Sequence, residues 1–372
     1  MKNFSPKAVL TLGALGVSMF AFAGNKDRTG QAGATELLVN PWGQSTGLFG
    51  MNVSGVKGLE AMKCNIAGMA FTDNMEVGVS HTIYLSGSQV SVNNIGLSKK
   101  IGNIGAIGFN IMSMNFGSIT ITDDNNPEGG IGDYKPAFYN IELGYAKDFS
   151  NSIHAGIGVT LVTEQITNAK ATGAAFEAGV QYVTGERNNF HFGVTLRNIG
   201  TNMRFSGPGF AINGDAPENA NYQLNRSIPS EKFEMPTYLS MGASYDFFLD
   251  ENHTKSEKDM PKHRLSVLLN FTSNSFINDY IGGGLEYSFR NMLMLRGGYR
   301  YEKAIGSDNS VTMYTGFCAG ATIQKGIGEK GPIFALDYSY RPTAHPANGV
   351  HTISLRLMTR AKKEKSDDDS DK

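Results

Sequence analysis

The chain has 372 residues and a formal net charge of −1 at neutral pH. It contains 45 glycines, 22 phenylalanines and 15 tyrosines but a single tryptophan. Nucleic-acid binding favours a basic face, so we expect no nucleic-acid partner for this near-neutral chain. Two cysteines are too few for a disulfide framework. Abundant glycine and aromatic residues instead suit strands whose ends meet a membrane interface.

The first 23 residues are typical of a secretory signal peptide. Lys2 and Lys7 precede or flank the start of an apolar core over residues 8–22, and Ala21 and Ala23 frame a cleavage site. The apolar core is shorter than the ~20 residues that a spanning helix requires. Removal of residues 1–23, which include both lysines, leaves a mature chain of 349 residues with a net charge of −3.

Residues 24–75, which we call the hatch, lack strand-like periodicity. Val56, Leu59, Met62 and Ile66 recur at three- or four-residue spacing, which predicts an amphipathic helix over residues 54–67. We expect this segment to fill the mouth of a pore, because the strands that follow offer no soluble core. A helix packed on the flank of a soluble domain is the alternative.

Fourteen strand-length segments follow, between residues 76 and 359. Many of them alternate: Ile141 and Leu143 share one face, while Asn140, Glu142 and Gly144 take the other. An even number of such segments predicts an all-β fold, a transmembrane antiparallel up-and-down β-barrel. We place the strands near residues 76–85, 88–101, 105–116, 138–149, 153–165, 173–183, 190–199, 237–247, 263–273, 279–289, 292–301, 312–323, 333–340 and 350–359.

Alternation alone would also fit a soluble β-sandwich, and the lengths of the connections decide between the two folds. The third and seventh connections, 117–137 and 200–236, are long. Long odd loops and short even turns predict a barrel that starts in the periplasm and lies in the outer membrane of a Gram-negative bacterium. The tight even connections are residues 102–104, 150–152, 184–189 and 290–291.

Two charged segments depart from this pattern. The eighth connection, 248–262, falls on the side where turns should be short, and we interpret it as a periplasmic excursion. Residues 360–372 carry five basic and five acidic side chains without an apolar anchor, which predicts a disordered tail.

Charged side chains occupy the polar faces of several strands. A Lys or Arg facing lipid near the midplane costs ~2–4 kcal/mol, so we expect these residues to line the lumen. They would form either a mutually paired network that fills the bore or a polar channel or ligand site. The lumen-lining candidates are Glu142, Glu177, Arg197, Glu286, Arg296, Arg300, Asp337 and Arg356.

The two cysteines fall on the hatch and on a strand. Cys318 is expected to point inward, so a disulfide with Cys64 would pin the hatch to the wall in an oxidising compartment. Two inert buried thiols are the alternative. The sequence contains no H-E-x-x-H and no G-x-S-x-G motif. We therefore expect no enzyme activity, cofactor or metal site.

Several short motifs resemble those of a known family. The stretch from Asn65 to Ala70 is similar to the Asn-Pro-Ala-Gly-Leu-Ala motif of the fatty-acid-transporter superfamily of outer-membrane barrels, with Ile66 in place of the proline. Within that superfamily the chain more closely resembles the PorV/PorQ family. The motifs that carry this resemblance are residues 30–33, 40–42, 58–62, 127–132, 145–147 and 181–185.

This resemblance implies a fourteen-stranded barrel with an N-terminal hatch and a place in the type IX secretion pathway. Family members dock cargo or translocon partners, so the implied partners are secretion-system proteins or secreted cargo proteins, beside outer-membrane lipid. The long loops 117–137 and 200–236 would then carry recognition. The rival hypothesis is a fatty-acid-transporter-like channel for small hydrophobic or polar solutes.

Overall fold

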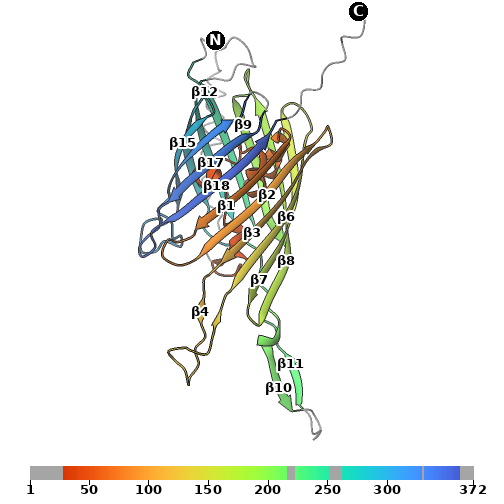
Figure 1. Ribbon diagram of the computed structural model, residues 1–372, viewed down its shortest axis with the longest axis vertical. Coiled ribbons are helices and arrows are strands. Elements are labelled where there is room, and N and C mark those ends of the chain that lie inside the picture. The colour runs from red at the N-terminus through yellow and green to blue at the C-terminus, as the bar shows by residue number, and fades with distance from the viewer. Residues whose placement is uncertain (1–27, 216–222, 251–261, 329–330, 361–372) are drawn as a thin grey trace, which may run out of the picture.

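The computed structural model describes residues 28–215, 223–250, 262–328 and 331–360. It confirms the predicted fold class, since fourteen antiparallel strands form one closed barrel (Figure 1). The first barrel strand, β1, pairs along its length with the last, β18, from Met75 opposite Thr359 to Ile83 opposite His351. The signal peptide and most of the charged tail lie outside the described residues.

The barrel strands match the predicted order, with every neighbour in sequence also a neighbour in space. They are β1 (Met75–Ile83), β2 (Ser91–Ile101), β3 (Gly105–Asn115), β6 (Ala137–Asp148), β7 (Ile153–Ile166), β8 (Ala169–Thr184) and β9 (Phe190–Gly200) in the first half. The second half comprises β12 (Tyr238–Phe248), β13 (His263–Asn274), β14 (Tyr280–Phe289), β15 (Leu293–Glu302), β16 (Phe317–Gly326), β17 (Ile333–Arg341) and β18 (Val350–Thr359).

The two faces of the barrel wall have opposite chemistry. On β2, Ile95 and Leu97 point outward and are exposed, whereas Asn94 and Ser98 point inward and are buried. An apolar exposed face around a polar interior is the reverse of a soluble sandwich and is typical of barrels in lipid. No helix in the described ranges is long and apolar enough to span a membrane.

One predicted strand begins later than expected. The segment predicted to start at residue 312 joins the barrel only at Phe317, as β16. Gly316 has φ +93°, a conformation that interrupts a β-ladder, and Tyr314 instead forms an isolated bridge with Thr343. The chain before Gly316 therefore belongs to a loop at the barrel mouth.

The long odd connections contain structure that the sequence did not predict. The third holds the short hairpin of β4 (Ile119–Thr120) and β5 (Asp133–Tyr134). The seventh holds η5 (Pro208–Phe210) and the hairpin of β10 (Ala211–Asp215) and β11 (Gln223–Ser227). Both hairpins project beyond the same end of the barrel (Figure 1). Residues 251–261 of the eighth connection lie outside the described residues.

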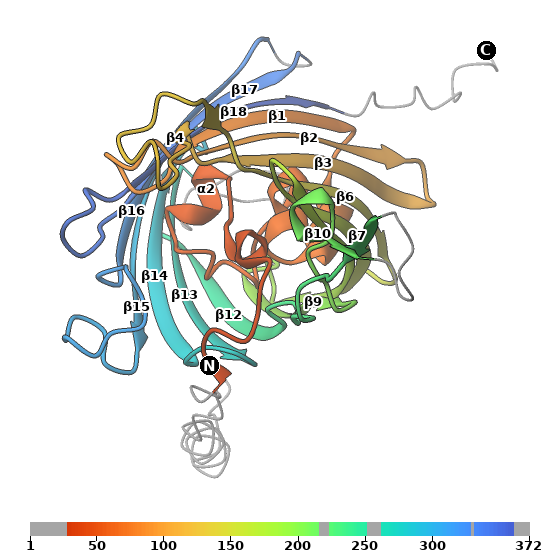
Figure 2. The ribbon, with the colours of Figure 1, turned by 90° about the horizontal axis from the view of Figure 1, so that it is seen from below.

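The hatch runs through the interior of the barrel (Figure 2). Its described part contains η2 (Thr35–Leu38), α2 (Gly43–Thr46), η3 (Gly58–Lys63) and η4 (Ile66–Phe71). The single amphipathic helix predicted over residues 54–67 is therefore wrong. Residues 58–70 of the hatch are all buried. The helical path is interrupted at Asn65, whose side chain accepts a hydrogen bond from the Ala67 amide. Side chain–backbone bonds of this kind compete with a continuous helix.

Candidate functional site

The contact surface between the hatch and the barrel wall is the candidate functional site. Its apolar part centres on Trp42 and Leu59, both fully buried. They lie so close to the wall that a Cβ built on Gly78 would be 2.8 Å from the indole of Trp42, and one on Gly96 would be 2.8 Å from Leu59. Only glycine leaves room for these side chains at those two wall positions.

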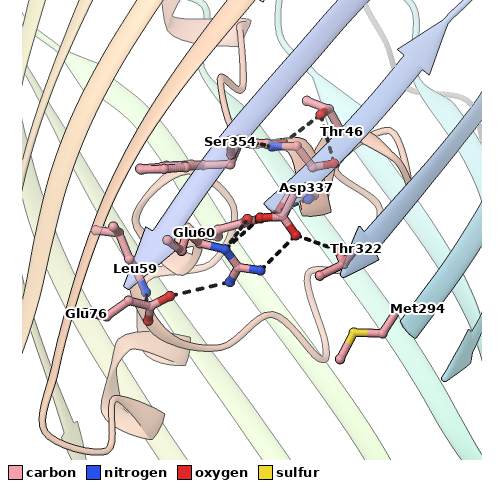
Figure 3. Close-up of polar contacts among 12 residues, drawn as sticks. Thr46, Leu59, Glu60, Glu76, Met294, Thr322, Asp337 and Ser354 are labelled. Atoms are coloured by element: carbon pink, nitrogen blue, oxygen red, sulfur yellow. Dashed lines mark hydrogen bonds and ion pairs between the residues drawn. The ribbon is translucent and has the colours of Figure 1, made fainter. Parts of the chain in front are cut away.

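The first polar part of this surface is the Arg356 cluster, formed by Glu60, Glu76, Asp337 and Arg356 (Figure 3). Arg356 on β18 makes a bidentate pair with Asp337 on β17, at 2.8 Å and 3.0 Å. Glu60 of the hatch and Glu76 on β1 each lie 3.4 Å from the same guanidinium. All four side chains are buried. One cation thus joins three strands and the hatch, and three carboxylates share it.

Hydrogen bonds hold the carboxylates of the Arg356 cluster in place. Ser45 donates to Glu60 through its backbone amide at 2.9 Å and its hydroxyl at 2.8 Å. The backbone amide of Leu59 donates to Glu76 at 2.8 Å. Burial raises the pKa of Glu60 to about 7, against the opposing effect of Arg356. Burial therefore favours the protonated form of this hatch carboxyl, and Arg356 favours the ionised form.

A second polar part is the Arg197 cluster, formed by Lys63, Glu142, Glu177 and Arg197. Lys63 of the hatch pairs with Glu142 on β6 at 3.1 Å. Arg197 on β9 pairs with Glu177 on β8 and donates to the Met62 carbonyl of the hatch at 2.8 Å. Two cations thus face two carboxylates. The hatch is tied by ionic contacts to both sides of the barrel.

The structure places the eight candidate residues as follows. Five belong to the two clusters just described. Arg296 pairs with Glu286 at 2.9 Å, and both are buried. Arg300 is half-buried at the other end of the barrel and pairs with Glu302 at 3.5 Å. Glu60 and Lys63 were not among the sequence-predicted residues, although two charges three residues apart in an otherwise apolar segment were an available signal.

The suggested disulfide between hatch and wall is not formed, because both cysteines are free thiols. Cys64 lies against the hatch itself, 3.4 Å from both the Gly50 carbonyl and the Asn52 side chain. Cys318 instead packs in a separate apolar cluster with Leu48. The structure thus has the alternative arrangement, two buried thiols.

Two cavities flank the hatch, one toward each end of the barrel. The inner cavity, of about 350 Å³, opens among the short even turns and is bordered by Lys57, Asp246 and Thr359. The outer cavity, of about 470 Å³, lies among the odd loops and is bordered by Phe49 and Arg341. Hatch residues line both cavities. The hatch therefore lies between two cavities within one bore.

Comparisons with known proteins bear on the fold. No protein-family model matches the chain, and no curated protein sequence matches it. Among solved structures, the toluene transporter TodX of Pseudomonas putida is similar, with a TM-score of 0.53 at 13% identity over 87% of this chain and 100% of TodX. A second TodX structure gives a TM-score of 0.52 at 12% identity, over 86% and 97% of the two chains.

The fold is that of the TodX barrel. A deletion variant of TodX, described as a monoaromatic hydrocarbon channel, aligns equally well, with a TM-score of 0.51 at 13% identity over 85% of this chain and 97% of its own. At 12–13% identity, these likenesses show the fold alone. They do not test the resemblance to the PorV/PorQ family.

Proposed function

We propose that this protein is an outer-membrane passage for small organic solutes and that movement of the hatch opens it. The observation that carries the proposal is the position of the hatch, seated in the bore between an outer and an inner cavity. A solute that reaches the outer cavity has to pass the hatch before it reaches the inner one. The fold shared with the toluene transporter TodX supports this function.

The chemistry of the hatch surface suits movement. Many of its contacts are hydrogen bonds and ion pairs, such as Thr46 to Ser339 at 2.6 Å and Thr72 to Ser98 at 2.7 Å. Water can replace such partners when the hatch shifts, so each hydrogen bond between neutral groups contributes only about 0.5–1.5 kcal/mol net. A wholly apolar seal would lose its full burial energy instead. The charged bore also favours polar or amphipathic solutes over hydrocarbons.

A reversible lock on the hatch tests the proposal. In a background of Cys64→Ala and Cys318→Ala, the changes Thr46→Cys and Ser339→Cys place two thiols where hydroxyls lie 2.6 Å apart. Oxidation should join the hatch to β17. We expect liposome swelling with small sugars and amino acids to stop on oxidation and to return on reduction.

A matched control is a disulfide that leaves the hatch free. Thr82 on β1 and Thr352 on β18 are wall residues with hydroxyls 3.0 Å apart. The pair Thr82→Cys and Thr352→Cys, in the same background, should leave swelling unchanged in both redox states. Equal swelling by the oxidised and reduced hatch lock, or no swelling by the unmodified protein, would contradict the proposed passage.

A second candidate function is docking of cargo or translocon partners in type IX secretion. The observation that favours it is the pair of hairpins, β4–β5 and β10–β11, which project from the odd-loop end of a rigid barrel. Projecting loops on a rigid scaffold are common binding surfaces. The resemblance of the hatch motifs to the PorV/PorQ family points the same way. Deletion of one hairpin, described in the Discussion, tests this candidate.

A further inference from the structure

Arg341 is the one buried arginine in the described chain without a carboxylate partner. Four arginines are buried there. Three of them pair with Asp or Glu: Arg197, Arg296 and Arg356. The Nε and Nη2 atoms of Arg341 have no hydrogen-bond partner, and the residue is only 6% exposed, so water does not replace the missing partners freely. A guanidinium stays charged in proteins, so deprotonation cannot relieve the cost of burying it.

Aromatic rings surround this guanidinium. Arg341 lies 5.5 Å from the ring centre of Phe49 and 5.2 Å from that of Tyr314. The guanidinium of Arg300 lies 4.0 Å from the ring centre of the same Phe49 and 4.7 Å from that of Tyr280. Cation–π contacts position the two arginines but supply no counter-charge.

The charges that border the outer cavity leave room for an anion. The carboxylate of Glu302 pairs with Arg300, not with Arg341. Glu36 also borders the cavity. Burial, and then the charge of Glu164, raise the pKa of Glu36 to about 8, which favours the neutral form of this carboxyl. Lys63 is paired with Glu142.

The backbone at Phe49 supports a built site. Phe49 has φ +56°, a left-handed conformation that bulky residues rarely adopt. Its ring meets that of Tyr314 edge-on, with centres 5.0 Å apart. Strain of this kind persists where the surrounding structure demands it, often at ligand sites. Here it directs an aromatic side chain of the hatch into the space between two arginines.

We propose that the outer cavity binds a small organic carboxylate with a flat apolar body, its carboxylate held by Arg341 and its body by Phe49 and Tyr314. A guanidinium fork matches a carboxylate in bidentate fashion. The cavity of about 470 Å³ accommodates a ligand of that size, and its lining mixes apolar with polar and charged side chains. This inference names the solute class of the proposed passage and rests on that function.

Binding to the purified mature protein in detergent tests the site, with benzoate as probe and benzamide as its uncharged analogue. We expect saturable calorimetric binding of benzoate and affinity for benzamide at least about tenfold weaker. Arg341→Gln should weaken benzoate binding by about tenfold to a hundredfold. The matched control is Arg187→Gln, because Arg187 also stacks on an aromatic ring, that of Phe248, but borders an even turn.

A second readout keeps the test independent of folding defects. Without ligand, Arg341→Gln should keep or raise the thermal midpoint, because it removes an unpaired buried charge. Arg341→Lys keeps the charge but loses the fork, and should bind benzoate more weakly than the unmodified protein. Equal affinity for benzoate and benzamide, no saturation up to about 10 mM benzoate, or undiminished binding by Arg341→Gln would each overturn the carboxylate site.

The two proposals fail in different ways. Benzoate binding through Arg341 without lock-sensitive liposome swelling would retain the anion site and contradict the passage. Lock-sensitive swelling without benzoate binding would retain the passage and contradict the anion site.

Discussion

Glu60 of the hatch lies 3.4 Å from Arg356 of the barrel wall, and both side chains are buried. Arg356 also neutralises Asp337 and Glu76, so a single cation compensates three buried carboxylates. Such an arrangement makes the cation indispensable, because its removal leaves carboxylates without a counter-charge in a low-dielectric site. The hatch and the last wall strand are therefore coupled through one side chain.

We predict that Arg356→Ala lowers the free energy of unfolding by about 3–5 kcal/mol, because it leaves buried carboxylates unpaired. Urea unfolding in detergent, followed by the fluorescence of Trp42, the single tryptophan, measures this. Arg290→Ala is the control, since Arg290 is exposed in an even turn and should change stability by less than about 0.5 kcal/mol. Equal midpoints for the two variants would show that the cluster does not hold the hatch.

The close approach of Trp42 to the wall leads to a second prediction. Gly78→Ala places a methyl group 2.8 Å from the indole and should destabilise the protein by about 1–3 kcal/mol. Gly297→Ala on β15 is the matched control, because its nearest contact would be 3.5 Å away, ordinary van der Waals distance. Thermal unfolding by circular dichroism compares them. A stable Gly78→Ala variant would mean that Trp42 moves without cost.

The raised pKa of Glu36 leads us to predict that the stability of the hatch depends on pH. Its folded-state pKa of about 8 lies above the ordinary 4.5, through burial first and then the charge of Glu164. The folded state thus binds the proton more tightly, and this contribution is fully present below about pH 4.5 and lost as pH rises through about 8. Hydrogen exchange of residues 35–38, corrected for intrinsic rates, should show weaker protection at alkaline pH.

Glu36→Gln should remove that part of the pH dependence, since the amide cannot ionise. The exposed Glu231→Gln serves as control and should leave it intact. If protection of residues 35–38 rises with pH, or if Glu36→Gln behaves like the unmodified protein, Glu36 does not govern the effect.

Cys64 provides a native reporter of hatch position. The thiol is buried, and burial raises its pKa to about 12 from the ordinary 9.0. The reactive thiolate is then about a thousandfold rarer than for a free cysteine. In a Cys318→Ala background, alkylation of the folded protein should be at least that much slower than in urea. Rapid labelling without denaturant would mean that the hatch leaves its seat spontaneously.

The β10–β11 hairpin supports a test of docking. The Ile228 amide donates to the Phe210 carbonyl at 3.0 Å, so the two ends of the hairpin are already adjacent. Replacement of residues 211–227 by two glycines should therefore spare barrel assembly, seen as unchanged heat-modifiable migration on gels. Under the docking hypothesis, co-purification of secretion-system partners from native membranes is lost. Unchanged co-purification would show that this hairpin is not the docking surface.

Local patterns explain how much of the fold was predictable. Residues such as Ile141 and Asn140 face opposite ways because the side chains of any strand alternate, and tight turns such as 102–104 bring neighbouring strands together. These features depend on short stretches of chain. The hatch helix failed as a prediction because the same spacing of Leu59 and Met62 also arises when a segment is buried on all sides.

The sequence by itself determined a closed sheet with an apolar outside, since alternation and turn length are local properties. Only the tertiary structure decided which charges meet. Glu60 reaches Arg356, and Lys63 reaches Glu142, because barrel closure and the path of the hatch bring distant segments together. The tertiary structure also leaves Arg341 without a carboxylate partner among the described residues. Electrostatic pairing depends on distances of a few ångströms between remote residues, and no periodicity along the chain encodes them.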